Sequence, residues 1–419
     1  MSVDQEIIQA NDYNGIPEKD RKIWLNTRKG YELISKLKKI PLIGQFIFFL
    51  FDQIQKISDF YSSQAKRRVE KRFISLTKRD LSKPSLQLTQ TFNLIKKGWG
   101  RDLIEKLIFK QKNEKKFSPF VSTFFVPAFM AEYFNYPGEI FCLICDTDIS
   151  RAWAPLNPES SRIKYFASTE RTVERLKLYG VKKENIFLTG FPLPLENIGS
   201  QKLEFLKQDL KTRLINLDPK KRFFKYYQAL IKSHLSDLSW QKSRALTIMF
   251  AVGGAGTQKE IGLKIIRKLA DKIKKNQVKV ILSAGTNLKI KRFFEKKCQG
   301  LDIEIIFKEK FEDYFHSFNQ ALRKTDILWT KPSELSFYSA LGLPIIIAPP
   351  VGSQEKFNKR WLLKSGFGLA QENPEYLDQW LFDWLEKGYL AEAAMQGFIE
   401  AEKKAIFNIE KIIKKTCSG

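Results

Sequence analysis

The stretch "TKPSELSFYSALGLPIIIAPP", residues 330–350, decides the predicted fold. It predicts a short helix followed at once by a strand. Pro332 suits a first helical turn, and Gly342 suits the end of the helix. The isoleucines after Pro344 are typical of a strand covered on both faces, as in a parallel sheet. The segment indicates an α/β fold, and Glu334, the lone carboxylate at the helix start, needs a separate explanation.

The composition predicts a soluble chain of two domains. A length of 419 residues exceeds what one core usually organises. With 43% hydrophobic and 28% charged residues, the chain is globular rather than disordered. Four cysteines and no visible secretory leader favour a reducing, cytoplasmic location. The longest apolar run, residues 40–51, falls short of the roughly 20 residues that a membrane span needs.

The formal charge of +26 favours partners that carry phosphate. Anionic membrane, nucleic acid and nucleotides all qualify, and a lysine-rich proteome would give the same charge. No nucleic-acid motif accompanies the lysines, so we expect no specific nucleic-acid partner. Two basic segments that contain aromatic residues, 38–51 and 96–116, suit a peripheral membrane surface, although the first suits a buried helix equally well.

A metal site is not expected. Cys142 and Cys145 form a CxxC pair inside an apolar, strand-like run, where a spacing of three residues puts them on opposite faces. There is no second CxxC pair, and His234 and His316 are the only histidines. The sequence therefore lacks the ligand pattern of a structural zinc site.

Short apolar runs alternate with amphipathic helical segments from Ser118 onward, which is typical of a parallel sheet wrapped by helices. Ser168 or Thr169 suits a helix N-cap, and Gly180 suits the end of that helix. The strands predicted for this first unit are residues 120–125, 139–145, 163–167 and 185–190.

A second α/β unit begins with "ALTIMFAVGGAGTQ", a strand that runs into a glycine loop. A helix over residues 259–275 should follow, and then strands over residues 278–284, 303–307, 326–329 and 344–349. The predicted domains are an N-terminal α/β domain with extra N-terminal helices (1–192), a helical linker (193–243), a second α/β domain (244–395) and a C-terminal helix that could pack back on the first domain (396–419).

The glycine loop suits a phosphate group. Gly253, Gly254 and Gly256 lie between a strand and a helix, where free backbone N–H groups and the helix dipole favour an anion. The loop matches neither GxGxxG nor GxxxxGK[ST], which disfavours dinucleotide binding and P-loop chemistry. A tight turn without a ligand would give the same pattern.

Two further segments carry polar side chains after strands. Ser333 and Glu334 follow one strand, and a carboxylate there has enough acceptor capacity for both hydroxyls of a ribose. The helix dipole alone would also favour this carboxylate. Gln354 and Asn358 follow the next strand four residues apart, so on a helix both amides share a face that could bind sugar hydroxyls.

Together these motifs, over residues 119–390, resemble the GT-B glycosyltransferases of the family 28 type. "VGGAGTQ" is similar to that family's glycine turn, "KPSELSFYSALGLP" to its Ser-Glu helix with Gly-x-Pro, and "SQEKFN" to its Gln-x-x-x-Asn. The resemblance implies two Rossmann-like domains facing a central cleft. It also implies a ribose contact for Glu334 and donor-sugar contacts for Gln354 and Asn358.

One departure from the family leaves three functions open. The family usually opens with a strand and a glycine-rich loop that receives the acceptor, and this unit is not visible in the sequence. The chain is then one of three proteins. It is either a hexosyltransferase in which another element takes the place of this unit, or a non-catalytic relative that binds a nucleotide or sugar, or a nucleotide-sugar epimerase of the same fold.

For the transferase we expect inverting chemistry without a metal or a separate cofactor. The co-substrate is a nucleotide-diphosphate sugar, with a UDP-sugar favoured, and the acceptor is a lipid or polyprenyl compound. Thr257 and Lys331 would help the glycine loop to stabilise the leaving diphosphate. Asp146 and Asp148, at the end of a strand, are the candidates for the catalytic base. Capping of the next turn or pairing with Arg151 would explain them equally.

Overall fold

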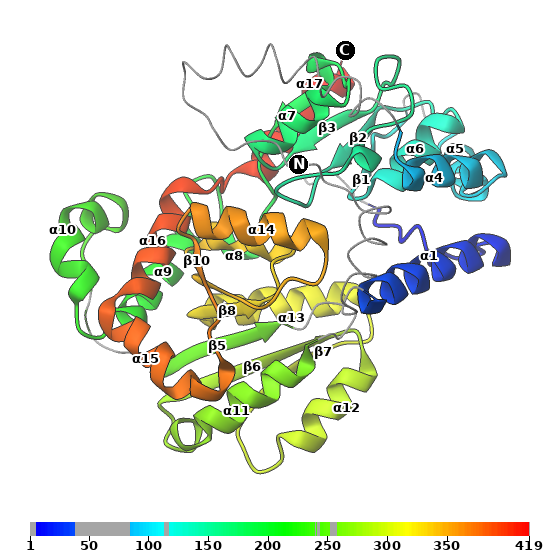
Figure 1. Cartoon of the computed structure of the whole chain (residues 1–419). Coiled ribbons are helices and arrows are strands. Elements are labelled where there is room, and N and C mark those ends of the chain that lie inside the picture. The colour runs from blue at the N-terminus through cyan, green and yellow to red at the C-terminus, as the bar shows by residue number, and fades with distance from the viewer. Residues whose placement is uncertain are drawn as a thin grey trace. The chain divides into compact units, whose positions relative to one another are not determined.

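The computed structural model describes residues 6–37, 84–112, 117–238, 240, 244–251 and 258–418. The chain divides into two compact units (Figure 1). Unit 1 comprises Met1–Gly190 together with Asn408–Gly419, and unit 2 comprises Phe191–Phe407. Each unit is an α/β structure built on a parallel sheet, which confirms the predicted fold class.

Within the described residues, the sheet of unit 1 has four parallel strands in the order β1-β2-β3-β4. The order along the chain is also the order in space, so these strands run in one direction across the sheet without a reversal. All four were predicted, and each is shorter than its apolar run. Their bounds are β1 Phe120–Ser122, β2 Ile140–Leu143, β3 Lys164–Ala167 and β4 Ile186–Leu188.

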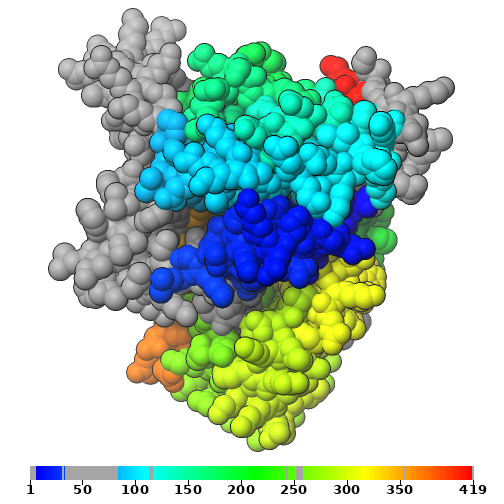
Figure 2. All heavy atoms as spheres, turned by 90° about the vertical axis from the view of Figure 1, so that its right-hand side faces the viewer, coloured from blue at the N-terminus to red at the C-terminus, as the bar shows by residue number. Residues whose placement is uncertain are grey.

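Helices surround this sheet. Thr169 is the N-cap of the helix after β3, where its hydroxyl accepts a hydrogen bond from the Thr172 N–H, as predicted. Ahead of β1 the described chain is mainly helical, and Figure 2 shows α1 lying against α4 and α5. The rings of Trp24 and Trp99 join these helices, with centroids 4.7 Å apart. The helices are α1 Glu18–Leu37, α4 Leu86–Lys96, α5 Arg101–Lys110, α6 Phe125–Tyr133 and α7 Glu170–Leu178, with short 3₁₀ turns η1 Arg151–Trp153 and η2 Lys183–Asn185.

The last helix, α17 (Ala405–Ser418), returns to unit 1. It carries isoleucines at helical spacing, which predicts an apolar stripe. Ile409, Ile412 and Ile413 pack against a small cluster of β-strand residues that includes Phe141 and Phe166. Burial of this stripe joins the C-terminus to the sheet of the first unit.

The sheet of unit 2 has six parallel strands within the described residues, in the order β10-β9-β8-β5-β6-β7. When the strands are numbered from β5, this is the 3-2-1-4-5-6 order of a doubly wound fold. The order in which the chain adds strands reverses between β5 and β8. β10 was not predicted, because "GLA" offers three residues without the β-branched side chains that mark a strand. The bounds are β5 Leu246–Ala251, β6 Val278–Gly285, β7 Glu304–Phe307, β8 Ile327–Thr330, β9 Ile345–Ile347 and β10 Gly368–Ala370.

The segment predicted as a helical linker, 193–243, contains helices, and these belong to unit 2. Its apolar residues recur at helical spacing, and Leu206, Leu210 and Leu214 are buried in the same core as the strands. The helices of unit 2 are α8 Leu195–Ile198, α9 Glu204–Leu217, α10 Arg222–Leu235, α11 Lys259–Lys274, α12 Leu288–Lys297, α13 Phe311–Lys324, the 3₁₀ helices η3 Glu334–Leu341 and η4 Pro374–Tyr376, α14 Ser353–Lys364, α15 Leu377–Lys387 and α16 Tyr389–Glu400.

Candidate functional site

Three central strands of unit 2 end at the same level of the sheet. Ala251 is in register with Thr330, and Thr330 is in register with Ile347. The Thr330 hydroxyl donates to the Ala251 carbonyl at 3.3 Å, and the Ala348 N–H donates to the Thr330 carbonyl at 2.9 Å. The reversal of strand order lies between β5 and β8, and doubly wound sheets bind ligands at the carboxyl ends of the strands beside such a reversal. This edge is the candidate site.

The glycine loop comes directly after β5 in the sequence, but its predicted residues Gly253, Gly254, Gly256 and Thr257 lie outside the described residues. The first described residue after the loop is Gln258, which has a φ of 78°. Its side-chain amide donates to the Pro349 carbonyl at 2.7 Å. The start of α11 is therefore tied to the chain that follows β9.

The segment after β8 carries Glu334, as predicted, but on a helix of a different kind. η3 is a 3₁₀ helix, and it begins at Glu334, two residues after Pro332. Ser333 has an extended backbone and makes no side-chain cap. Gly342 ends the helix at a φ of 65°, in the left-handed region that glycine adopts without strain. Glu334 is exposed in the first turn and is open to a ligand.

Two phenols lie within the electrostatic reach of Glu334. Burial raises the pKa of Tyr338, one turn further along η3, and the charge of Glu334 raises it further. Burial also raises the pKa of Tyr314 on α13, and Glu334 adds to this effect. The Tyr314 hydroxyl is 2.8 Å from the Ser283 hydroxyl at the end of β6. Both phenols therefore stay protonated beside the carboxylate.

Lys331 belongs to an ion pair that was not predicted. Its Nζ lies 2.6 Å from Oε1 of Glu355, and both side chains are largely buried. Oε2 of the same carboxylate accepts hydrogen bonds from the N–H groups of Val351 and Gly352, at 2.5 and 3.3 Å. A Glu three residues after a helix N-cap is the signal of a capping box and could have revealed Glu355. Lys331 is therefore half of an ion pair. The negative charge of Glu355 offsets the positive charge that Lys331 could offer a diphosphate.

Gln354 and Asn358 both lie on α14, as predicted, but only Gln354 is partly exposed. Asn358 is 0% exposed, and its amide donates to the Pro332 carbonyl at 3.2 Å. The shared helix face packs toward η3, and it buries the second amide while the first remains near solvent. The structure therefore gives Asn358 a contact to the loop after β8 instead of the open position expected for a sugar contact.

In unit 1 the structure opposes a catalytic role for Asp148. The carboxylate is 4% exposed and accepts from Nε and Nη2 of Arg175, at 2.7 and 3.1 Å. The Ile149 N–H donates to it as well, at 2.9 Å. The expected alternative partner, Arg151, instead donates to the Ala154 carbonyl. A base must have a lone pair open to the acceptor, and this carboxylate is enclosed by its own partners.

Asp146 has a different position, two residues earlier in the chain. It follows β2 and is partly exposed, and its main-chain carbonyl accepts from the Ser168 hydroxyl at 2.6 Å. Of the two predicted carboxylates, it is the one that solvent reaches. It remains a prediction for the base.

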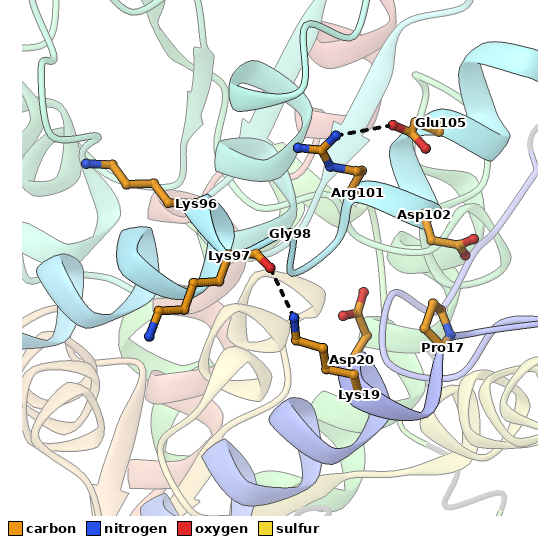
Figure 3. A pocket seen from close by; sticks show the side chains of 9 residues that line it. All are labelled: Pro17, Lys19, Asp20, Lys96, Lys97, Gly98, Arg101, Asp102 and Glu105. Atoms are coloured by element: carbon orange, nitrogen blue, oxygen red, sulfur yellow. Dashed lines mark hydrogen bonds and ion pairs between the residues drawn. The ribbon is translucent and has the colours of Figure 1, made fainter.

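Unit 1 also contains a hollow of about 490 Å³ between α1, α4 and α5 (Figure 3). Its charged side chains have partners close by. Lys19 Nζ donates to the Lys97 carbonyl at 3.1 Å, the Asp20 carboxylate accepts from the Gly100 N–H at 3.0 Å, and Arg101 lies 4.0 Å from Glu105. The hollow is mixed in charge, and nothing in it matches the predicted motifs.

The described part of the chain offers neither a metal site nor a membrane span. Its histidines, cysteines and carboxylates form no group of three or more that could hold a metal ion. Its helices include none with the length and apolar character needed to cross a bilayer.

The chain is similar to known proteins at low sequence identity. A family described as a domain of unknown function (DUF6938) matches residues 239–317. A processive diacylglycerol beta-glucosyltransferase of Bacillus subtilis is 24% identical over 58% of this chain and 54% of its own length. One from Staphylococcus aureus is 22% identical over 67% of this chain and 61% of its own length. The chain thus spans about half to three-fifths of these relatives, whose names agree with the predicted resemblance to glycosyltransferases.

Solved structures also align with the chain, at low sequence identity and with TM-scores below 0.5. The S. aureus MnaA-UDP co-structure aligns with a TM-score of 0.47 and 14% identity, over 79% of this chain and 82% of that chain. Acinetobacter baumannii MurG aligns with a TM-score of 0.42 and 12% identity, over 74% of this chain and 77% of that chain.

Proposed function

We propose that this protein is a glycosyltransferase that moves a hexose from a nucleotide-diphosphate sugar to a lipid hydroxyl. The observation that supports the proposal is that the three strands that precede the predicted motifs end together at one edge of unit 2. The strands before the glycine loop, before Glu334 and before Gln354 end in register beside the reversal of strand order. A parallel sheet collects ligand groups at such an edge.

The proposed donor is a UDP-sugar, bound by groups with distinct chemistry. The exposed carboxylate of Glu334 accepts from the two ribose hydroxyls. The amides of residues 253–257 and the N-terminus of α11 receive the diphosphate. Gln354, partly exposed on α14, contacts the sugar, while Asn358 fixes the loop that carries Glu334 through its bond to the Pro332 carbonyl.

The proposed chemistry is an inverting displacement. The acceptor oxygen forms a bond to the anomeric carbon as the bond from that carbon to the diphosphate breaks. Asp146 takes the proton of the acceptor hydroxyl, and the diphosphate leaves as an anion stabilised by the glycine-loop amides. Neither step requires a metal or a separate cofactor.

The names of the relatives support a lipid acceptor. Both are named for transfer to diacylglycerol, so a diacylglycerol-like lipid is the first acceptor to test. Such a substrate would bring the protein to the cytoplasmic face of a membrane as a peripheral protein. The charge of +26 supports an anionic surface.

Calorimetric unfolding with UDP, GDP, TDP and CDP tests the donor site. A nucleotide at about 100 times its dissociation constant should add roughly 2.7 kcal/mol to the unit that binds it. Glu334→Ala should abolish the gain. The matched control Glu386→Ala removes an exposed carboxylate on α15 of the same unit and should keep it. No gain with any nucleotide would refute the donor site.

Transfer is tested next with UDP-glucose and diacylglycerol, followed by detection of the glycolipid. Binding of UDP without any glycolipid, over a range of lipid acceptors, would contradict the transferase and favour a relative that only binds the nucleotide. Conversion of the free UDP-sugar to its epimer would favour the epimerase.

A further inference from the structure

Helix α10 of unit 2 exposes far more of its surface than a helix packed in a core. It runs along the outside of the unit and contacts α15 and α16 (Figure 1). Within this fully described helix, Phe223, Ile231 and Leu235 are buried, whereas every residue from 225 to 230 is exposed. Six consecutive exposed residues cover more than one full turn. The backbone kinks at Tyr227, whose ring stacks on Phe223 with centroids 4.7 Å apart, and the residues around this kink are exposed to solvent.

The charge on this helix has a single sign. α10 contains no aspartate or glutamate, and Arg222 and Lys225 are exposed on it, just after Lys220 and Lys221. One carboxylate lies close by: Asp218 is buried and accepts from backbone N–H groups of the first turn, at 2.8 Å for Arg222 and 2.9 Å for Phe224. At the other end Lys232 forms an exposed pair with Asp237 at 2.9 Å.

Apolar and aromatic side chains lie among these cations. Tyr226 is 78% exposed, and Leu230, four residues later and beyond a kink at Tyr227, is 37% exposed. An exposed tyrosine ring in water has no apolar partner. At a membrane interface the ring contacts lipid while the hydroxyl contacts water. Cations flanking exposed tyrosine and leucine are the features of a helix that lies in the plane of an anionic bilayer.

A generally lysine-rich surface does not explain this combination, as α12 of the same unit shows. α12 carries five lysines and arginines against three in α10, and two of them, Lys296 and Lys297, lie in its last turn. Its aromatic residues, however, face inward. Phe294 is fully buried, and Phe293 packs on the core beneath the Lys259 ammonium, which lies 4.3 Å from the ring centre. Both helices are basic, but of the two only α10 exposes an aromatic side chain beside its cations.

We propose that α10 docks unit 2 on an anionic lipid bilayer. The exposed cations contact lipid phosphates, and Tyr226 and Leu230 enter the interface between headgroups and acyl chains. This surface rests on the peripheral membrane location in the proposed function and names the helix that would provide the contact, but it is separate from the sugar site and its test does not depend on transfer. A nucleic acid would satisfy the cations, but it would leave Leu230 without a partner.

Vesicle flotation of the full chain tests the surface. Vesicles of phosphatidylcholine alone are compared with an equal mixture of phosphatidylcholine and phosphatidylglycerol. Arg222→Gln with Lys225→Gln should weaken binding to the mixed vesicles about thirtyfold, because each basic residue near an anionic surface contributes about fivefold. Tyr226→Ser should weaken binding severalfold. The matched control, Lys296→Gln with Lys297→Gln on α12, removes the same charge and should change binding less than about twofold.

Three outcomes would overturn the proposal. Binding that falls equally in the α10 and α12 variants would show a general charge effect. Absence of wild-type flotation on mixed vesicles would show that no such surface exists. Loss of duplex DNA binding in the α10 variant, with vesicle binding unchanged, would assign the helix to nucleic acid. Thermal unfolding of each variant controls for folding, and because nucleotide calorimetry is a separate readout, the donor site can fail while this surface stands.

Discussion

Asp148 in unit 1 and Glu334 in unit 2 are both carboxylates a few residues beyond the end of a parallel strand, and the tertiary structure gives them opposite environments. Asp148 is buried and enclosed by two hydrogen bonds from Arg175. Glu334 is exposed at the start of η3, and two protonated phenols lie within its electrostatic reach. A position shortly after a parallel strand determines at which edge of the sheet a carboxylate lies. The partners from other elements decide whether it can meet a ligand.

The sheets differ in the same way. The described strands of unit 1 follow one another across the sheet, whereas in unit 2, where all described strands are parallel, the order in which the chain adds strands reverses between β5 and β8. At such a reversal, the segments that follow the two neighbouring strands leave toward opposite faces of the sheet, and a crevice opens between them. Only the sheet of unit 2 has this feature within the described residues, which is why the proposed donor site lies there.

The largest expected effect tests the buried pair. Arg175→Ala leaves the Asp148 carboxylate buried without its main cation, and it should lower the free energy of unfolding of unit 1 by about 3–5 kcal/mol. Urea denaturation of wild type and variant measures the change. A loss below about 1 kcal/mol would mean that the pair is not structural, and Asp148 would return as a candidate base.

An intermediate effect tests the buried amide of α14. Asn358→Ala removes the donor to the Pro332 carbonyl and should destabilise unit 2 by about 1–3 kcal/mol. Because this bond fixes the loop that carries Glu334, nucleotide affinity should fall as well. Gln354→Ala is the matched control on the same helix face. It should leave stability within about 0.5 kcal/mol of wild type and weaken UDP-glucose more than UDP.

A reversal of that pattern would exchange the roles of the two amides. If Asn358→Ala left stability unchanged and weakened only UDP-glucose, Asn358 would contact the sugar directly, as the motif first suggested. Calorimetry with UDP and UDP-glucose on both variants distinguishes the cases.

The smallest expected effect on stability belongs to Glu334. Its side chain is exposed, so Glu334→Gln should change the unfolding free energy by no more than about 0.5 kcal/mol. The amide keeps one acceptor oxygen but loses the charge, and nucleotide affinity should fall about tenfold, since a hydrogen bond to a charged group contributes about 1.5–3 kcal/mol. Equal affinity in the two proteins would remove Glu334 from the ribose contact.

Local patterns predicted most elements because they depend on neighbouring residues. The four strands of unit 1 follow from apolar runs bounded by turn residues, and the helix after Thr169 follows from its cap. The short strand β10 lacked such a pattern, since its pairing with β9 depends on residues far away in sequence. The segment 193–243 showed its helices but not their partners, and only packing assigns them to unit 2.

The sequence by itself determined the α/β class, the order of strands and helices along the chain, and the three motifs that follow β5, β8 and β9. These depend on periodicity and turn chemistry within short windows. Only the tertiary structure decided that the three strands end in register, that Asn358 is buried, and that Lys331 pairs with Glu355 and Asp148 with Arg175. The physical reason is that burial and ion pairing depend on partners brought together by packing, and spacing along the chain does not specify those partners.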